Sequence, residues 1–222
     1  MALLPLYVFD AYGTLFDVHS AIARHRAEIG PQAARLSELW RSKQLEYTWV
    51  RSLADVYRDF EALTAESLDV AAALCGGIGD DLRDKLLDAY RHLDAFPDVA
   101  PALDALRAHG AKTAILSNGT PDMLAAAVSS AGLERCFDAV ISVDALGIYK
   151  TAPEAYRLIE KKFGIGPEET SFQSSNRWDI AGARAFGLRG VWINRTGQPD
   201  EYTDLAPATV LKSLDGLPGM DV

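Results

Sequence analysis

The pattern of hydrophobic positions divides the chain into a short strand, a long helical block, and a region where strands and helices alternate. Residues 6–10 form an apolar run with the length of a buried strand, and no second strand pattern occurs before about residue 112. Between them, apolar side chains recur at spacings of three and four residues, as at Leu36, Leu39 and Trp40, which is typical of amphipathic helices. We predict helices near residues 20–29, 34–53, 55–75 and 80–94.

Strand and helix patterns alternate from Phe96 onward. Strands are predicted at residues 112–117, 139–143, 170–174 and 190–194, and helices at residues 99–109, 121–131, 153–163 and 178–186. Such alternation is typical of an α/β fold with a doubly wound, mainly parallel sheet covered on both faces. The helical block after the first strand is then an inserted cap. We predict a core domain of residues 1–16 and 95–222 and a helical cap domain of residues 17–94.

The composition is that of an ordinary globular protein. Of the 222 residues, 49% are apolar and 24% are charged, which excludes disordered and fibrous classes. A net charge of -9 without a Lys/Arg-rich stretch argues against nucleic-acid and membrane partners. The two cysteines, Cys75 and Cys136, form no cluster, so neither a disulfide framework nor a zinc site is indicated. No segment has the pattern of a signal peptide or membrane anchor, and we expect a cytoplasmic protein.

Reactive side chains occur where the predicted strands end. Asp10 ends the first strand, Ser117 ends the second, Lys150 follows the third after a short loop, and Asn176 and Asp179 follow the fourth. Ligands of open α/β sheets bind outside the carboxyl ends of the strands. The sequence therefore predicts one crevice that contains two carboxylates, an ammonium group and neutral hydrogen-bond donors.

Five motifs, in order and with compatible spacing, resemble those of the haloacid dehalogenase superfamily and, within it, of the L-2-haloacid dehalogenases. They are residues 9–17 (FDAYGTLFD), 39–47 (LWRSKQLEY), 117–119 (SNG), 149–150 (YK) and 174–179 (SSNRWD). The resemblance spans about residues 6 to 195. It implies a Rossmann-like core with a helical cap, which agrees with the pattern of predicted elements.

One departure from the superfamily pattern bears on the type of reaction. Phosphatases of the superfamily use a second aspartate, two residues after the nucleophile, to protonate the leaving alkoxide, whereas this chain has Tyr12 there. A halide leaves without a proton, so loss of this acid removes phosphate ester hydrolysis and spares dehalogenation. One lysine can neutralise a substrate carboxylate where a phosphatase needs magnesium. We therefore expect neither a metal ion nor any other cofactor.

The resemblance implies hydrolytic dehalogenation of short L-2-haloalkanoic acids to D-2-hydroxy acids. Asp10 attacks C2 from the side opposite the halogen, which forms an aspartyl ester and inverts the carbon. Lys150 and Ser117, with nearby backbone N–H groups, hold the substrate carboxylate. Arg41 receives the halide, with Asn118 and Phe60 beside it.

The resemblance assigns hydrolysis of the ester to Asp179, which activates a water held with Asn176 and Lys150. Thr14 and Ser174 orient the two carboxylates, and Tyr156 supports Lys150. The remaining substrate-binding residues are Ala11 and the apolar wall of Tyr12, Leu45, Phe60 and Trp178.

Other functions remain open at this point. The same ester chemistry can act on fluoroacetate or on a strained cyclic amino acid, a phosphatase is possible despite Tyr12, and the fold can serve as a non-catalytic binding module. The partners that we expect are a small 2-haloalkanoate, halide and water. The resemblance also implies a homodimer.

Overall fold

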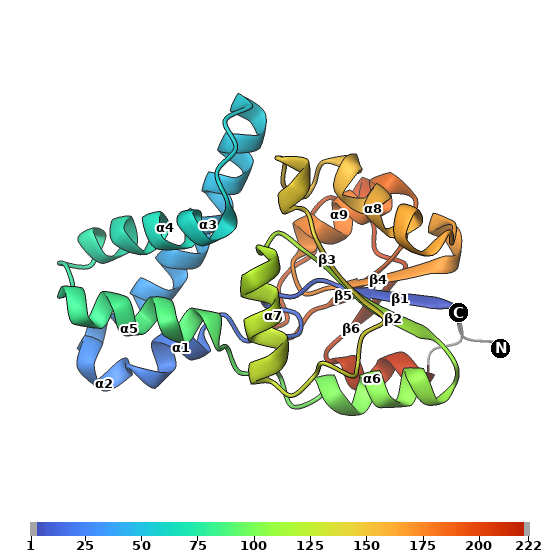
Figure 1. Cartoon of the computed structure of the whole chain (residues 1–222), viewed down its shortest axis with the longest axis horizontal. Coiled ribbons are helices and arrows are strands. Elements are labelled where there is room, and N and C mark those ends of the chain that lie inside the picture. The colour runs from blue at the N-terminus through green and yellow to red at the C-terminus, as the bar shows by residue number, and fades with distance from the viewer. Residues whose placement is uncertain (1–3, 220–222) are drawn as a thin grey trace.

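A six-stranded parallel sheet forms the centre of the larger part of the molecule in the computed structural model, which describes residues 4–219 (Figure 1). The strands are β1 (Leu6–Phe9), β2 (Lys112–Ser117), β3 (Ala139–Ser142), β4 (Thr170–Ser174), β5 (Arg189–Ile193) and β6 (Thr209–Leu211). Their spatial order is β3-β2-β1-β4-β5-β6, and every neighbouring pair is parallel. The predicted α/β fold class is confirmed. The strand order changes direction at β1, which is where ligands bind in such sheets.

Strand β1 lies in the middle of the sheet because all four of its side chains are apolar and buried. It pairs with β2 on one side and with β4 on the other. The register sets Phe9 opposite Ile115 and Gln173. As a result, Asp10 and Ser174 emerge next to each other at the carboxyl end of the sheet.

Helices cover both faces of the sheet. They are α6 (Val99–Ala108), α7 (Pro121–Ser130), α8 (Pro153–Phe163) and α9 (Arg177–Phe186). Helices α8 and α9 lie on one face, and α6 and α7 on the other, as right-handed crossovers require (Figure 1). Thr120 caps the start of α7 by accepting from the backbone N–H of Met123 at 3.2 Å. Gly187 ends α9 with a φ of 105°, a conformation that favours glycine.

Five helices are inserted between β1 and α6, and they lie to the left of the sheet in Figure 1. They are α1 (Ser20–Arg24), α2 (Arg26–Ile29), α3 (Ala33–Ala54), α4 (Phe60–Leu74) and α5 (Asp80–Arg91). The predicted helical block is therefore present. The predicted helix at 55–75 starts too early, because Asp55 adopts a left-handed φ of 56° that ends α3. Helix α4 begins after Asp59, whose carboxylate accepts from Ala62 N at 2.8 Å.

The carboxyl-terminal segment contains two elements that the sequence pattern did not predict. Strand β6 extends the sheet beside β5, and a 3-10 helix at Leu214–Gly219 packs against α6 through the buried side chains of Leu214 and Leu217. Shorter 3-10 turns occur at Gly30–Gln32, Asp144–Leu146, Pro167–Glu169 and Thr203–Leu205. The ends of the predicted core domain, residues 1–3 and 220–222, lie outside the described residues, and the exact division at residues 17 and 94 stays a prediction.

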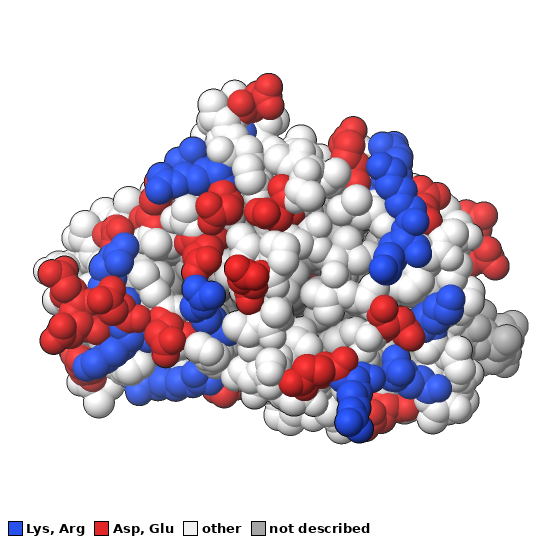
Figure 2. Space-filling model, in the orientation of Figure 1, with Lys and Arg blue, Asp and Glu red and all other residues white. Residues whose placement is uncertain are grey.

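The surface carries a mixture of charges. Figure 2 shows acidic and basic side chains interspersed on one face, with acidic side chains gathered over the inserted helices at the left. Four aspartates of α5 contribute to the acidic character of this part of the chain. Within residues 4–219, none of the helices combines the length and the apolar character of a bilayer-crossing segment. Cys75 and Cys136 are free thiols that are only partly buried.

Candidate active site

Asp10 is held at the carboxyl end of β1 by contacts with three segments of the chain. Its backbone N–H donates to Gln173 O at 2.9 Å, and its side chain is almost fully buried. The Oδ2 atom accepts hydrogen bonds from Thr14 Oγ1 at 2.9 Å, from Asn176 Nδ2 at 2.8 Å and from Ser174 Oγ at 3.4 Å. Three neutral donors therefore fix one oxygen of this carboxylate and leave the other, Oδ1, to a different partner.

That partner is Lys150, whose ammonium group lies between two carboxylates. Its Nζ donates to Asp10 Oδ1 at 3.1 Å and to Asp179 Oδ2 at 2.9 Å. All three side chains are buried, with exposed fractions of 1% for Lys150 and 0% for Asp179. Burial lowers the pKa of Lys150, but the two carboxylates raise it more, so that the pKa lies above its ordinary value. The lysine is therefore a permanent cation in this interior position.

Asp179 begins α9 and is fixed from the side opposite Lys150 by Tyr156. The Tyr156 hydroxyl donates to Asp179 Oδ1 at 2.7 Å. Burial raises the pKa of Asp179 to about 6, because desolvation and the charge of Asp10 outweigh the effects of Lys150 and Tyr156, which lower it. The structure places the Tyr156 hydroxyl on Asp179 and not on Lys150, so the support expected for Lys150 is indirect. A carboxylate with this pKa can accept a proton at neutral pH.

The donor set around Asp10 does not fit a divalent metal ion. Magnesium takes oxygen ligands in an octahedral arrangement. Here the ammonium group of Lys150 lies between Asp10 and Asp179, and Tyr12, the second residue after Asp10, supplies no carboxylate. Across residues 4–219, no group of three or more His, Cys, Asp or Glu side chains is arranged to hold a metal.

Arg41 reaches the site from α3 of the inserted helices. Its guanidinium donates to Gln44 Oε1 at 2.8 Å, to the backbone oxygen of Tyr12 at 3.2 Å and to Asn176 Oδ1 at 3.3 Å. All three acceptors are neutral, and no ion pair of Arg41 is found among the described residues. The positive charge of Arg41 therefore remains available to a small anion in the site.

A small cavity of about 10 Å³ lies between Asp10 and Arg41. It is lined by Asp10, Tyr12, Arg41, Leu45, Phe60, Ser117, Asn118 and Trp178. Asn118 Oδ1 accepts from the backbone N–H of Lys150 at 3.0 Å, and Ser117 Oγ accepts from Gly119 N at 3.1 Å. The first bond joins the loop after β2 to the loop before α8, and the second stabilises the turn after β2. The cavity thus combines a carboxylate, a cation and an apolar wall in a space that holds about one water molecule.

Eight of the fifteen residues predicted for the site line this cavity, and the other seven do not. Among those seven, Lys150 contacts Asp10 and Asp179, and Tyr156 contacts Asp179. Ala11 is buried, and its carbonyl accepts from the backbone N–H groups of Thr14 and neighbouring residues in the turn after β1. Arg41 and Phe60, which lie far from Asp10 in sequence, are at the cavity as predicted.

Sequence reasoning missed two residues of the site. Gln44 anchors Arg41, and is itself held by Thr64, to whose Oγ1 it donates at 2.7 Å, and by the Tyr90 hydroxyl, which donates to Gln44 Oε1 at 3.1 Å. Its position three residues after Arg41 on one helix face could have indicated this contact. Trp49 packs against Trp178 with ring centroids 5.7 Å apart, and no sequence signal connects these two residues.

The arrangement suits nucleophilic substitution by a carboxylate. Asp10 is anchored, its charge is balanced by Lys150, and Arg41, which has no ion pair among the described residues, lies on the same small cavity. A second carboxylate, Asp179, lies beside the same lysine and can serve as a base.

Comparisons with known proteins agree with this chemistry. A family model described as haloacid dehalogenase-like hydrolase matches residues 4–187. The chain is 47% identical to (S)-2-haloacid dehalogenase 1 of Pseudomonas sp. (strain CBS-3), over 95% of this chain and 93% of the relative.

Two solved structures are similar to this chain in fold as well as in sequence. A dehalogenase with an intermediate complex shares 44% identity and a TM-score of 0.95, and the match covers 98% of this chain and 96% of the other. The L-2-haloacid dehalogenase from Xanthobacter autotrophicus with chloropropionic acid covalently bound shares 36% identity and a TM-score of 0.91, over 98% of both chains. On this sequence and structural similarity, the chain belongs to the haloacid dehalogenase-like hydrolases and, among them, to the family of the (S)-2-haloacid dehalogenases.

Proposed function

We propose that this protein hydrolyses short L-2-haloalkanoic acids to D-2-hydroxy acids and halide through an ester on Asp10. The observation that carries this proposal is the pairing of a buried carboxylate, one oxygen of which is held by three neutral donors, with Lys150 between it and Asp179. The names of the relatives and the covalently bound chloropropionic acid in the Xanthobacter autotrophicus structure support the same reaction.

In the first step, Asp10 Oδ1 attacks C2 of the substrate from the side opposite the halogen. The new C–O bond forms as the carbon–halogen bond breaks, and the bonding electron pair leaves with the halide toward Arg41. Two negative groups must approach each other, and at an effective dielectric of 20 two unit charges 4 Å apart repel by about 4 kcal/mol. Lys150 offsets this repulsion, while Ser117 and backbone N–H groups near Ala11 hold the substrate carboxylate.

The three donors on Asp10 Oδ2 act in the second step. After Oδ1 has bonded to carbon, Oδ2 is the carbonyl oxygen of the ester. Attack by water makes this atom an oxyanion, and Thr14, Ser174 and Asn176 already donate to it. Donors that are fixed before the charge develops stabilise such an intermediate by several kcal/mol.

Asp179 is the base of the second step. It takes a proton from a water held with Asn176 and Lys150, and the water oxygen attacks the ester carbon of Asp10. The intermediate collapses, the bond between Cγ and Oδ1 of Asp10 breaks, and Oδ1 leaves as the hydroxyl oxygen of the 2-hydroxy acid, which takes up the proton. Asp10 regains a carboxylate that now contains one oxygen from water.

A substrate panel tests this function. We expect halide from L-2-chloropropionate and not from the D enantiomer, with the same rate in the presence of a chelator. The Asp10→Asn variant loses turnover, whereas Asp17→Asn, in the same motif but outside the cavity, retains it. In a single turnover in heavy-oxygen water, the label enters the protein and not the hydroxy acid.

Other results would point to the competing functions. Halide from fluoroacetate alone indicates a narrower substrate class, magnesium-dependent phosphate release without halide indicates a phosphatase, and binding without any turnover indicates a binding module. Label found directly in the product, with an unlabelled protein, contradicts an ester on Asp10.

We also propose that the protein is a cytoplasmic homodimer. Large apolar side chains are exposed at the end of α3 and just beyond it, with exposed fractions of 55% for Val50, 90% for Leu53 and 53% for Val56. Exposed apolar patches of this kind mark protein interfaces. The free, partly buried cysteines suit a reducing compartment.

A further inference from the structure

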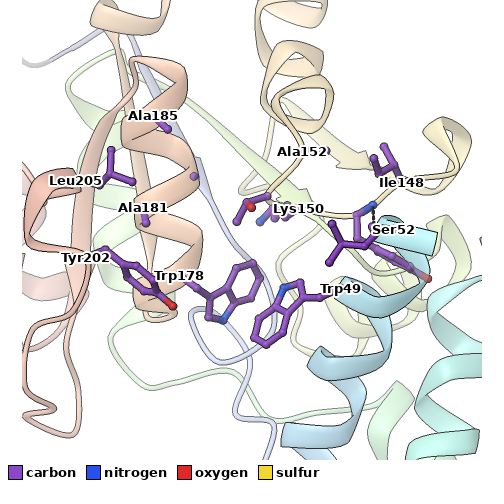
Figure 3. Close-up of a pocket in the computed structure, with 14 residues that line it drawn as sticks. Trp49, Ser52, Ile148, Lys150, Ala152, Trp178, Ala181, Ala185, Tyr202 and Leu205 are labelled. Atoms are coloured by element: carbon purple, nitrogen blue, oxygen red, sulfur yellow. Dashed lines mark hydrogen bonds between the residues drawn. The ribbon is translucent and has the colours of Figure 1, made fainter. Parts of the chain in front are cut away.

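A second, larger cavity lies directly behind the wall of the catalytic cavity. It has a volume of about 600 Å³ and is bounded by the carboxyl-terminal half of α3, residues 148–152 before α8, and α9 (Figure 3). Its lining is predominantly apolar. The one charged side chain that lines it is Lys150, which already bonds to Asp10 and Asp179. This cavity therefore fits an uncharged, apolar group.

Trp178 separates the two cavities. Its indole lines the 10 Å³ catalytic cavity and also the 600 Å³ cavity. Trp49 of α3 packs against it, with ring centroids 5.7 Å apart and an angle of 81° between the ring planes. Figure 3 shows the two indoles next to each other, Trp178 on α9 and Trp49 on α3. The edge-to-face contact with Trp49 holds the Trp178 ring in its separating position.

The geometry of the substrate directs its alkyl chain toward this partition. In the proposed reaction, the carboxylate of the substrate and its halogen are taken by polar groups, so the alkyl chain faces the apolar wall. In that wall, Tyr12 and Phe60 are buried and pack against other aromatic rings, and neither of them lines the larger cavity. Trp178 has a large cavity behind it.

We propose that the 600 Å³ cavity is an accessory substrate site for the alkyl chain of longer L-2-haloalkanoic acids, and that Trp49, by holding Trp178, limits the chain length that enters. This inference rests on the proposed function. Each methylene that moves from water into an apolar site contributes about fourfold in affinity. The cavity thus selects among 2-haloacids by the length of their chain.

Two variants that change the cavity in opposite directions test the proposal. Trp49→Ala removes the support of Trp178, and Ala181→Leu fills the cavity from α9. The measured quantity is kcat/KM for L-2-bromooctanoate divided by that for L-2-bromopropionate. We expect Trp49→Ala to raise this ratio about tenfold or more and Ala181→Leu to lower it about tenfold or more, because about two methylenes, at about fourfold each, are gained or lost at the site.

Controls separate this proposal from the proposed function and from misfolding. Glu46→Gln, on the exposed side of the same helix and outside the cavity, leaves the ratio unchanged. If Ala181→Leu loses activity on both acids, Ala185→Leu at the exposed rim replaces it. A wild-type protein that releases no bromide from L-2-bromopropionate contradicts the proposed function itself. Bromide release from L-2-bromopropionate with an unchanged ratio in both cavity variants overturns the accessory site alone.

Discussion

Lys150 keeps its positive charge in the protein interior because Asp10 and Asp179 both lie within hydrogen-bonding distance of it. Removing one partner of such a buried ion pair typically costs about 3–5 kcal/mol, since the remaining charge is left without water or partner. The same three side chains perform the proposed chemistry. At this scale, stability and reactivity depend on the same contacts.

The pH dependence of turnover tests the role of Asp179. Its pKa is raised to about 6, and only the ionised carboxylate can act as base, so we expect kcat to rise as the pH increases through about 6 and to level off above it. The measurement is halide release from L-2-chloropropionate between about pH 4 and pH 8, which is about two units on either side of that pKa.

Asp179→Asn should lower kcat about a hundredfold or more and cause the ester on Asp10 to accumulate, which mass spectrometry of the protein detects. Asp138→Asn, in the surface ion pair with Arg107, serves as the matched control. Turnover close to that of the wild type in Asp179→Asn would assign the base to another group.

Several residues of helix α3 contribute to the catalytic cavity or to its walls. Arg41 and Leu45 lie one turn apart and reach the catalytic cavity, Gln44 anchors Arg41, and Trp49 supports Trp178. The helix thus delivers a cation, its anchor, an apolar wall and the boundary of the larger cavity.

Gln44→Met tests whether the anchor of Arg41 matters for catalysis. Methionine keeps the approximate shape of the side chain and removes the oxygen that accepts from Arg41. A hydrogen bond to a charged group is worth about 1.5–3 kcal/mol, so we expect kcat/KM to fall about tenfold or more. Lys43→Met, which removes only a surface ion pair with Glu46 on the same helix, should leave kcat/KM unchanged. Equal rates in the two variants would show that Arg41 does not need this anchor.

The elements with a strong periodic pattern were predicted, and those shaped by distant contacts were not. Strand β1 was evident because it is an unbroken apolar run, and the strand ends placed Asp10, Ser117 and Asp179 at one edge of the sheet. Strand β6 was missed because it is a short edge strand in a region rich in Pro, Asp and Gly, where side-chain pattern is weak. Trp49 and Trp178 lie in segments far apart in sequence, so the local pattern of hydrophobic positions does not predict their contact.

At the scale of the whole molecule, the helices inserted after β1 supply one half of the site and the sheet supplies the other. Arg41 of α3 donates to Tyr12 O and Asn176 Oδ1, which belong to loops at the carboxyl edge of the sheet. These bonds and the packing of Trp49 on Trp178 join the two parts across the cavity.

The proposed homodimer is tested by the mass of the protein in solution. We expect light scattering to give twice the chain mass, and Leu53→Asp to shift the protein toward the mass of one chain, because an aspartate in an apolar interface is costly to desolvate. Glu46→Asp, at an exposed polar position of the same helix, is the control. A monomeric wild-type protein would contradict the dimer and leave the catalytic proposal intact.

The catalytic cavity has room for about one water molecule, and this small volume affects how substrate enters and product leaves. Because a 2-haloacid is larger than this cavity, the contacts between the inserted helices and the sheet must open for substrate to enter and for product to leave. If this opening is slower than the chemical steps, added glycerol lowers kcat because it raises the viscosity. Substrates with a good leaving group such as bromide and a poorer one such as chloride then have nearly the same kcat.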